Sequence, residues 1–452
     1  MIKFRTDFNS CKTVACNNFG VIASPDYIYR SRRLGYLSIE CKVCGSNPPW
    51  VNNWLVASSL DEKINFHLSR KIGGCPICNH NFFIGGGQES IRHGFTSAGI
   101  QRKKCNHCHA VFTLPQDKNR ALYQLMIAAI SSAKSSHEVI KELGISARLF
   151  YFYLNKLAII LSNFSRMLED KGLVGDDLSL HSEGRVLQLA YQRGFYYLIT
   201  SHSDSGYVLL QSHNLTKQKL KPEDTYSSKR NSIITSPKEQ SITHILASRY
   251  QQNMQREHFE KLLVGELHPL SRCSLLFPST LAYVHFQLLT AFTFRARQYS
   301  HYIEHESSLR AAALMASYPE IKQGHASIYY FLPVQDKHEH LQGKKMGWWK
   351  DRWFSYGEGA YSPIVGDELA VSDGHVIAND AADEFHHYLQ RHLNDKINSL
   401  AVLDNISEIH RVIFNYCELK EGKSRANRMA LCKQRYTPAS LLDAALDLLM
   451  VG

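Results

Sequence analysis

The sequence predicts a multidomain α/β protein, and three observations lead to this prediction. Paired cysteines form two sets before residue 110. From residue 119 to about residue 164 the apolar residues follow a helical period. After residue 175, short β-rich runs alternate with helical runs, as expected of a mixed α/β core. A chain of 452 residues is long enough for two to four such domains.

The second cysteine set has the spacing of a structural zinc site. It consists of two Cys-x2-Cys pairs separated by 26 residues: Cys75, Cys78, Cys105 and Cys108. Each pair can form a knuckle whose backbone N–H groups point at the thiolates, and two knuckles enclose one tetrahedral Zn²⁺. Strands predicted at residues 82–84 and 100–104, with a glycine turn at 85–87, would make a zinc ribbon over residues 73–116. The alternative is a set of buried free thiols or a redox pair.

The first cysteine set predicts a second zinc ribbon. It combines a Cys-x4-Cys pair with a Cys-x2-Cys pair after 24 further residues: Cys11, Cys16, Cys41 and Cys44. Both spacings lie within the range of structural zinc sites. The intervening run YIYRSRR, residues 27–33, places aromatic residues among three arginines. We expect this ribbon and a linker over residues 1–72, unless the two pairs are unrelated to each other.

Residues 117–170 predict two helices joined by a glycine turn. Ser135 and Glu138 have the spacing of a capping box, Gly144 suits a left-handed turn, and Ser146 precedes a longer helix. This order is that of a helix-turn-helix, in which outward residues near the start of the second helix meet base edges. Those residues are Arg148, Tyr151 and Asn155. The alternative is a plain helical hairpin inside a core.

Residues 171–419 predict the main α/β domain. Three meandering strands are followed by helix, strand, helix and strand, which is the order of a ribonuclease-H-like core with a mixed sheet and helices on both faces. Residues 334–378, which contain GKKMGWWKDRW, are interpreted as an insertion. Residues 420–452 form a predicted tail whose first part carries six Lys or Arg against one Glu.

The charge predicts a polyanionic partner. The net charge is +11 with His neutral, and each Lys or Arg placed on a phosphate releases condensed counterions. The predicted ribbon strand carries three such cations: Arg102, Lys103 and Lys104. No run approaches the ~18 apolar residues of a membrane span, and the N-terminus lacks the apolar region of a secretion signal. We therefore expect a cytoplasmic protein.

The residues around the second cysteine set are similar to a known family. The run HGFTSAGIQRKKCNHCHAVFT resembles the zinc ribbon that opens many bacterial insertion-sequence transposases, and NYCELKEGKSRANRMALCK resembles their closing segment. In that family a helix-turn-helix and a ribonuclease-H-like domain follow the ribbon. The resemblance implies a DDE-type recombinase that acts on double-stranded DNA, as a homo-oligomer on the nucleoid. It also implies Mg²⁺ or Mn²⁺ in addition to two structural zinc ions.

The resemblance implies three carboxylates that hold the catalytic metal ions. The first belongs on the first strand, where Asp177 or Asp176 stands. The second belongs after the fourth strand, where the chain offers Glu304 and Glu306, although the family usually has Asp. The third belongs on a late helix, at Glu384 with Asp380 and Asp383 as neighbours. Further candidates are Asp204 and Asp373.

Three classes of function follow from these features. The first is a metal-dependent strand-transfer enzyme that acts on the ends of a mobile element. The second is a catalytically degenerate, domesticated transposase that binds specific DNA as a regulator or targeting subunit. The third is a zinc-dependent protein–protein adaptor whose basic charge is incidental.

Overall fold

The structure is a computed structural model in which the chain forms two compact units. It describes residues 4–68, 75, 77, 90–113, 119–189, 193–233, 240–333, 339–356, 359–366, 380–393, 397 and 399–451. Unit 1 comprises Met1–Asp61, Gly175–Gln188 and Gln192–His386. Unit 2 comprises Glu62–Val174, Leu189–Tyr191 and His387–Gly452. Within the described ranges, no single helix is long and apolar enough to cross a lipid bilayer.

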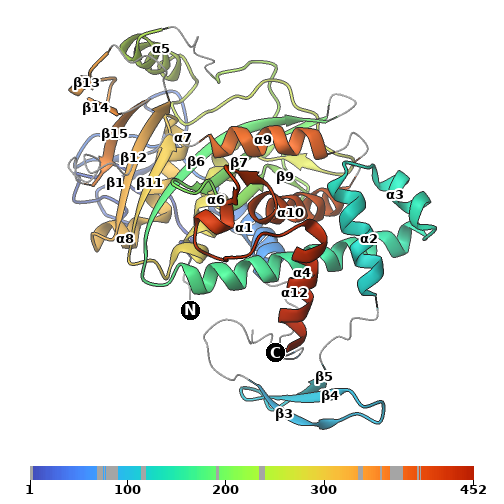
Figure 1. Ribbon diagram of the computed structural model, residues 1–452. Helices are drawn as coiled ribbons and strands as arrows, with labels where there is room; N and C mark the ends of the chain where they lie inside the picture. The colour runs from blue at the N-terminus through green and yellow to red at the C-terminus, as the bar shows by residue number, and fades with distance from the viewer. Residues whose placement is uncertain are drawn as a thin grey trace. The chain divides into compact units, whose positions relative to one another are not determined.

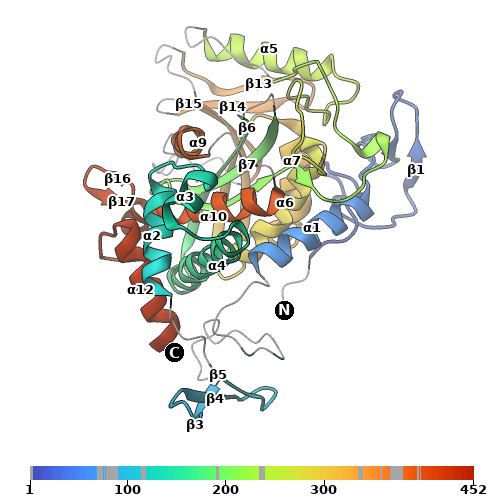
Figure 2. The same cartoon turned by 90° about the vertical axis from the view of Figure 1, so that its right-hand side faces the viewer.

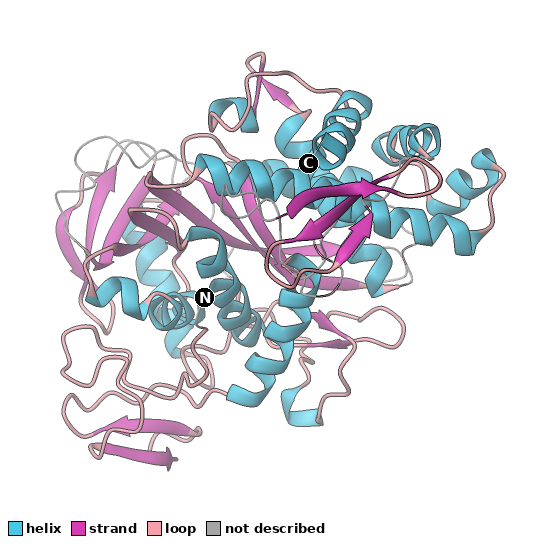
Figure 3. Ribbon diagram, turned by 90° about the horizontal axis from the view of Figure 1, so that it is seen from below, coloured by secondary structure: helices cyan, strands magenta, loops and turns pink. Residues whose placement is uncertain are grey.

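An eight-stranded mixed sheet forms the centre of unit 1 (Figures 1 and 3). Its order is β13-β14-β15-β12-β11-β6-β7-β8. The strands are β6 (Asp177–Gln188), β7 (Gly194–His202), β8 (Val208–His213), β11 (Gln298–Glu304), β12 (Ala326–Pro333), β13 (Gln342–Met346), β14 (Asp351–Tyr356) and β15 (Gly359–Val365). Neighbours along β6-β7-β8 are antiparallel, whereas β11 runs parallel to both β6 and β12. The aromatic and β-branched run of β7 suits this position, because the strand is buried almost throughout.

Helices pack against both faces of this sheet. α6 (Pro278–Thr293) and α7 (Ser307–Ala316) contact one face, and α6 touches β7 and β8 (Figure 2). α6 is apolar nearly all round and is buried along most of its length, as expected of a core helix. The start of α9 (Ala381–His392) is attached to the sheet by a 2.7 Å hydrogen bond between the Tyr197 hydroxyl and His386 Nδ1. Side chains alternate along β6, so Ser182 lies on the α6 side while Glu183 lies on the α9 side.

The segment interpreted as an insertion belongs to the sheet. β15, β14 and β13 lie within it and continue the sheet beyond β12 in antiparallel pairing. Trp353 on β14 is fully buried, and its indole N–H donates to the Tyr250 hydroxyl at 2.9 Å. Tyr250 comes from α5 (Ile242–Met254) and donates to Asp351 at 2.7 Å. A lysine- and glycine-rich sequence therefore forms a sheet edge here because a few aromatic residues supply its buried contacts.

A chain of buried hydrogen bonds links the sheet to α6. Ser182 Oγ lies 2.7 Å from His301 Nε2, and Thr200 Oγ1 lies 2.8 Å from His285 Nε2. His301 also contacts Phe286, and His181 stacks on Tyr302 across the other face. Burial lowers the pKa of both His181 and His301 to about 3. Both imidazoles are therefore neutral in the folded protein at physiological pH.

Lowering the pH from 7.5 to 5.5 is expected to destabilise unit 1. The unfolded chain protonates each histidine near pH 6.5 while His181 and His301 stay neutral, so stability is lost as the pH falls below 6.5. At pH 5.5 each histidine lowers the free energy of unfolding by about 1.4 kcal/mol relative to pH 7.5. Urea unfolding of His301→Gln should show a pH dependence smaller by about this amount, whereas His93→Gln at an exposed site should match the wild type. Equal pH dependence in all three proteins would contradict this account.

Unit 2 is mainly helical. Its helices are α2 (Arg120–Ser131), α3 (Ser136–Leu143), α4 (Ala147–Gly172), α10 (Leu400–Tyr416), α11 (Arg425–Arg428) and α12 (Pro438–Val451), while α1 (Asn53–His67) crosses the unit boundary. The predicted capping box at Ser135 and Glu138 is confirmed, as is the left-handed Gly144, with φ of 61°. Ser146 caps α4, which lies at 109° to α3. The two helices therefore meet at a sharp corner.

The predicted basic tail is largely folded. Its first part forms the hairpin β16 (Leu419–Lys420) and β17 (Lys423–Ser424), followed by α11. Arg425 is buried, with its guanidinium carbon 3.5 Å from the centre of the Phe414 ring. α12 packs on α2 and α4, and Arg120 binds Asp447 at 2.5 Å. The helices α2, α3 and α4 are therefore part of a larger helical unit.

Candidate functional site

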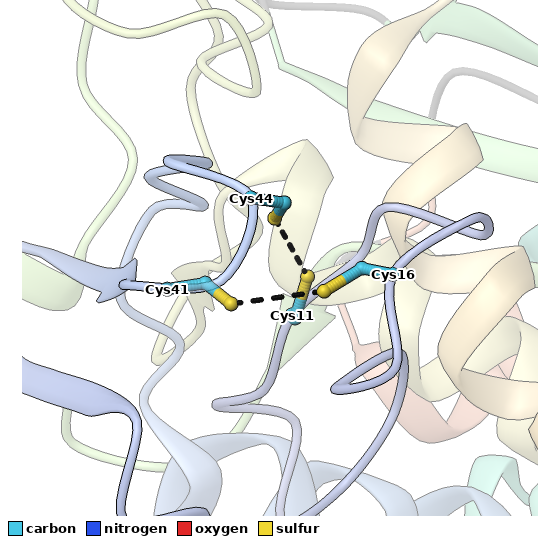
Figure 4. Close-up of side chains that lie close together, drawn as sticks. All are labelled: Cys11, Cys16, Cys41 and Cys44. Atoms are coloured by element: carbon cyan, nitrogen blue, oxygen red, sulfur yellow. Dashed lines mark hydrogen bonds between the residues drawn. The ribbon is translucent and has the colours of Figure 1, made fainter.

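The first cysteine set converges on one point. Figure 4 shows Cys11, Cys16, Cys41 and Cys44 with their sulfurs facing one another. The Sγ atoms of Cys11 and Cys44 lie 3.5 Å apart, and those of Cys16 and Cys41 lie 3.8 Å apart. A tetrahedral Zn²⁺ with Zn–S bonds of about 2.3 Å would place its sulfurs about 3.8 Å apart. The cluster could therefore hold a zinc ion on all four predicted ligands.

Hydrogen-bond donors surround these sulfurs. The Asn18 backbone N–H donates to Cys16 Sγ at 3.4 Å, and the Asn18 amide donates to Cys41 Sγ at 3.7 Å. Cys44 Sγ lies 3.1 Å from the hydroxyl of Ser46. Burial opposes ionisation of Cys44, but hydrogen bonds from Ser46 and Thr13 lower its pKa to about 6. Burial raises the pKa of Cys16 and raises that of Cys11 to about 12, whereas the surroundings of Cys44 favour the thiolate, which is the form that binds zinc.

This cluster is built into unit 1 and does not form the separate domain predicted over residues 1–72. Its strands β1 (Tyr27–Ser31) and β2 (Ser38–Cys41) form a two-stranded sheet, and the chain around them contacts the core. Phe8 packs on Tyr283, with ring centres 5.0 Å apart, and Lys12 binds Glu260 at 2.9 Å with both side chains buried. Gly20 has a positive φ, and a Cβ there would come within 2.2 Å of the Tyr318 ring.

The second cysteine set also converges as far as it is described. Cys75, Cys105 and Cys108 could hold a metal ion together, and the Sγ atoms of Cys75 and Cys108 lie 3.3 Å apart. The fourth predicted ligand, Cys78, lies outside the described residues, as do the predicted strand at 82–84 and turn at 85–87. The described part is a three-stranded sheet of β3 (Ser90–Phe95), β4 (Gln101–Cys105) and β5 (Val111–Thr113). The predicted return strand thus corresponds to β4.

Cations occupy both faces of this small sheet. Lys103 on β4 lies directly opposite Arg92 on β3, and partial burial together with this arginine lowers the pKa of Lys103. Like charges placed opposite each other across strands repel, and a bound anion would relieve the repulsion. Side chains alternate along a strand, so Arg102 and Lys104 lie on the other face. The sheet can therefore present positive charge to a polyanion from either side.

The three residues predicted to read DNA share a face of α4. Arg148, Tyr151 and Asn155 are all exposed, at spacings of three and four residues. The opposite side of α4, which includes Phe150, Leu154 and Leu157, is buried. The outward side of α4 near its start is thus available to a partner.

The predicted catalytic acids do not all come together. Asp177 begins β6, lies in register with Gln298 at the start of β11, and binds Arg297 at 2.5 Å. Glu304 stands at the other end of β11, so Asp177 is separated from it by the length of the strand. Glu306 is buried in an ion pair with Arg256, at 2.9 Å. Asp177 and Glu306 are therefore each held in an ion pair with an arginine.

A different acid of β6 meets Glu304. The parallel pairing of β6 with β11 brings Glu183 next to Glu304, one position beyond the last paired residues. Glu304 accepts a 3.3 Å hydrogen bond from the backbone N–H of Gly184. Arg185 binds Glu183 at 2.6 Å and Asp383, in the first turn of α9, at 2.7 Å. Glu183 and Asp383 thus share one guanidinium, Glu304 lies on the neighbouring strand beside Glu183, and we call these four residues the carboxylate cluster.

Electrostatics within the carboxylate cluster are strongly coupled. Burial raises the pKa of Glu183, Arg185 partly offsets this, and the charges of Glu304 and Asp383 raise the pKa further. Burial opposes the charge of Arg185, but the three acids hold its pKa above the ordinary value. The Glu183 side chain is 13% exposed and that of Asp383 is 55% exposed. The cluster therefore opens to solvent on the α9 side.

Sequence reasoning named neither Glu183 nor Arg185, although both lie on β6. The strand continues to Gln188, and an acid followed by Gly184 within such a run was the available signal. The third acid was placed one residue away, at Glu384, with Asp383 and Asp380 as neighbours. Asp204 lies in the turn between β7 and β8, and Asp373 lies outside the described residues.

The three acids of the carboxylate cluster do not lie close enough together to form a metal-binding group as they stand. In the described part of the chain, the groups of three or more His, Cys, Asp or Glu with ligand atoms all within 4.8 Å of one another are the two cysteine clusters. Comparison with protein-family models, with curated proteins and with solved structures finds no match to this chain.

Proposed function

We propose that this chain is a DNA-binding, transposase-like protein that performs metal-dependent strand transfer on the ends of a mobile element. The observation that carries the proposal is the placement of Glu183, Glu304 and Asp383 on three separate elements, with Arg185 bound to two of them and Glu304 on the strand next to Glu183. A two-metal phosphoryl-transfer site needs carboxylates from separate elements, so that both the attacking and the leaving oxygen can be held. These residues replace the predicted combination of Asp177, Glu306 and Glu384.

The topology of unit 1 supports a ribonuclease-H-like core. β6, β7 and β8 form an antiparallel meander, and α6, β11, α7 and β12 follow in the order predicted from the sequence. Glu183 lies on the first strand of this order and Glu304 at the end of the fourth. Asp383 lies in the first turn of a later helix. Each acid thus occupies an element where the family resemblance implies one.

The three acids of the carboxylate cluster share one role in the proposed reaction, and neighbouring groups hold them in place. Glu183, Glu304 and Asp383 would hold the divalent ions, which when bound supply Lewis-acid stabilisation of the phosphate charge. The Gly184 N–H orients Glu304, and the Tyr197–His386 hydrogen bond holds the first turn of α9, which carries Asp383, on the sheet. The exposure of Asp383 leaves a route for a DNA strand from the solvent side.

DNA binding is expected to depend on the cations of the three-stranded sheet. The double variant Arg102→Gln/Lys103→Gln should reduce the slope of log K against log salt by about two, because each phosphate contact contributes about 0.9. Fluorescence anisotropy with a duplex from 50 to 200 mM salt measures this. Lys217→Gln/Lys219→Gln, two exposed lysines of unit 1, is the matched control. Salt-independent binding, or equal slopes in both double variants, would contradict the proposed role and favour the protein–protein adaptor.

The reaction itself is tested with a supercoiled plasmid that carries the element ends. Nicking that requires Mg²⁺ or Mn²⁺ and is absent with Ca²⁺ supports the proposal. Binding without nicking would support the second candidate, a domesticated transposase that acts as a DNA-binding regulator. One observation favours this candidate: Arg185 already binds two of the three carboxylates.

A further inference from the structure

A cavity of about 690 Å³ lies in unit 1, and none of its lining residues belongs to the cysteine clusters or the carboxylate cluster. Its walls come from residues 227–233, from the end of α5 with the residues that follow it, and from Phe277 at the start of α6. The volume is in the range of small-molecule sites. Ten of the thirteen lining residues are polar, so the cavity suits a polar ligand better than an apolar one.

Hydrogen bonds hold the walls of this cavity in place. The Ser232 N–H donates to the Leu263 carbonyl at 2.8 Å, and the Leu263 N–H donates to Ser232 Oγ at 2.7 Å. The Arg256 side chain is only 3% exposed, and it binds Glu306 at 2.9 Å and the Ser232 carbonyl at 3.3 Å. Its Nε is buried without a hydrogen-bond partner in the described part of the chain. The cavity is therefore preformed, and a ligand would not have to order its walls.

One positive charge on the cavity wall has no carboxylate partner. Lys261 pairs with Glu257, and Arg256 pairs with Glu306. Arg230 is exposed, and among the described residues its guanidinium makes no ion pair or hydrogen bond. A guanidinium can bind a phosphate through two parallel N–H···O bonds. The cavity can therefore hold one phosphate group at Arg230.

The rest of the lining suits a nucleobase. Asn231, Gln252 and Gln255 place amide groups at the cavity, and within the described ranges the side chains of both glutamines make no hydrogen bond. An amide donates and accepts at once, which matches the adjacent donor and acceptor on the edge of a base. Phe277 adds an aromatic ring, on which a base can stack.

We propose that this cavity binds a nucleoside monophosphate unit, either as a free nucleotide or as one nucleotide of a single DNA strand. Arg230 binds the phosphate, while the amides and Phe277 bind the base. The inference goes beyond the proposed function, because nucleotide binding here requires neither the carboxylate cluster nor strand transfer.

The test titrates each of the four deoxynucleoside monophosphates into the full-length, zinc-loaded protein by isothermal titration calorimetry, without Mg²⁺ or Mn²⁺. At least one nucleotide should bind. Its nucleoside and inorganic phosphate should each bind at least about tenfold more weakly, because each makes only part of the contacts. Arg230→Gln should weaken nucleotide binding about tenfold, since it removes a charge-assisted pair. Arg272→Gln, at an exposed arginine of unit 1 outside the lining, should bind like the wild type.

A second variant tests the contacts to the base. Gln252→Ala/Gln255→Ala should lower the preference for the nucleotide over inorganic phosphate, because it removes two of the amides. If Arg230→Gln is misfolded by circular dichroism, this double variant decides. Absence of nucleotide binding, equal affinity in the wild type and the folded variants, or phosphate binding as tight as nucleotide binding would each overturn the inference.

A displacement experiment separates the two sources of the nucleotide. A phosphorylated single-stranded oligonucleotide that displaces the bound nucleotide identifies a DNA strand as the ligand, whereas no displacement identifies a free nucleotide. Nucleotide binding by a protein that never nicks DNA would uphold this inference while the strand-transfer proposal fails. Metal-dependent nicking without nucleotide binding would do the reverse.

Discussion

Replacing Cys41 by serine is expected to unfold unit 1 at physiological temperature. Cys41 is fully buried, and its sulfur lies 3.8 Å from that of Cys16 in the first cysteine cluster. A structural zinc contributes about 10–16 kcal/mol of binding free energy in small zinc domains, whereas a whole domain is stable by only about 5–15 kcal/mol. Loss of the metal therefore removes a free energy as large as the whole free energy of unfolding of a typical domain. Thermal unfolding and zinc content, measured on the same sample, test this.

The contacts around the first cysteine cluster explain why loss of its metal would also destabilise the sheet. Phe8, Lys12 and Gly20 lie against residues of α6, α8 (Tyr318–Lys322) and the loop at Glu260. Releasing this segment would expose the buried Lys12–Glu260 pair and the Tyr283 ring, which makes the change cooperative. Cys273→Ser, at a half-buried thiol outside both clusters, is the matched control and should keep the wild-type melting temperature. A Cys41→Ser protein that melts like the wild type would show that zinc is not structural here.

Features set by neighbouring residues were predictable from the sequence. The four ligands of the first cysteine cluster converge because two short spacings bring each pair into one turn. The cap at Ser135 and the turn at Gly144 depend only on residues within one helical turn. The order of β6, β7, β8, α6, β11, α7 and β12 in unit 1 was likewise visible from residue patterns. In each case the physical cause acts within a few residues.

Features set by register between distant strands were not predictable. Which acid of β6 meets Glu304 depends on how β6 pairs with β11, and a shift of a few residues exchanges Glu183 for another side chain. The use of residues 342–365 as sheet edge depends on Trp353 and Tyr250 meeting across about a hundred residues of chain. No pattern within a few residues indicates the register of β6 with β11 or the contact between Trp353 and Tyr250. A single sequence therefore predicted the cysteine clusters but not which acid of β6 lies beside Glu304.

Glu304→Gln is expected to abolish DNA nicking, while Asp177→Asn should leave it near the wild-type level. Glu304 lies beside Glu183 in the carboxylate cluster, whereas Asp177 is bound to Arg297 at the far end of the same strand. Mutation of a residue that only orients a metal ligand lowers metal affinity or activity by about 10–100-fold. Loss of a ligand itself should therefore lower the nicking rate by more than about 100-fold. Glutamine keeps the shape of the side chain, which separates lost charge from lost packing. The rates come from plasmid nicking under single-turnover conditions with saturating Mg²⁺.

The comparison of these two variants decides between the two ends of β6. Both substitutions remove one negative charge and keep the side-chain size, so non-specific charge effects on DNA binding should be similar. Glu304 is half-buried and accepts the Gly184 N–H, a contact that glutamine can keep through its amide oxygen. Duplex affinity should therefore stay within about twofold in both variants. If Asp177→Asn were inactive and Glu304→Gln active, the catalytic carboxylates would lie at the opposite end of the sheet, and the carboxylate cluster around Arg185 would be an internal ion pair.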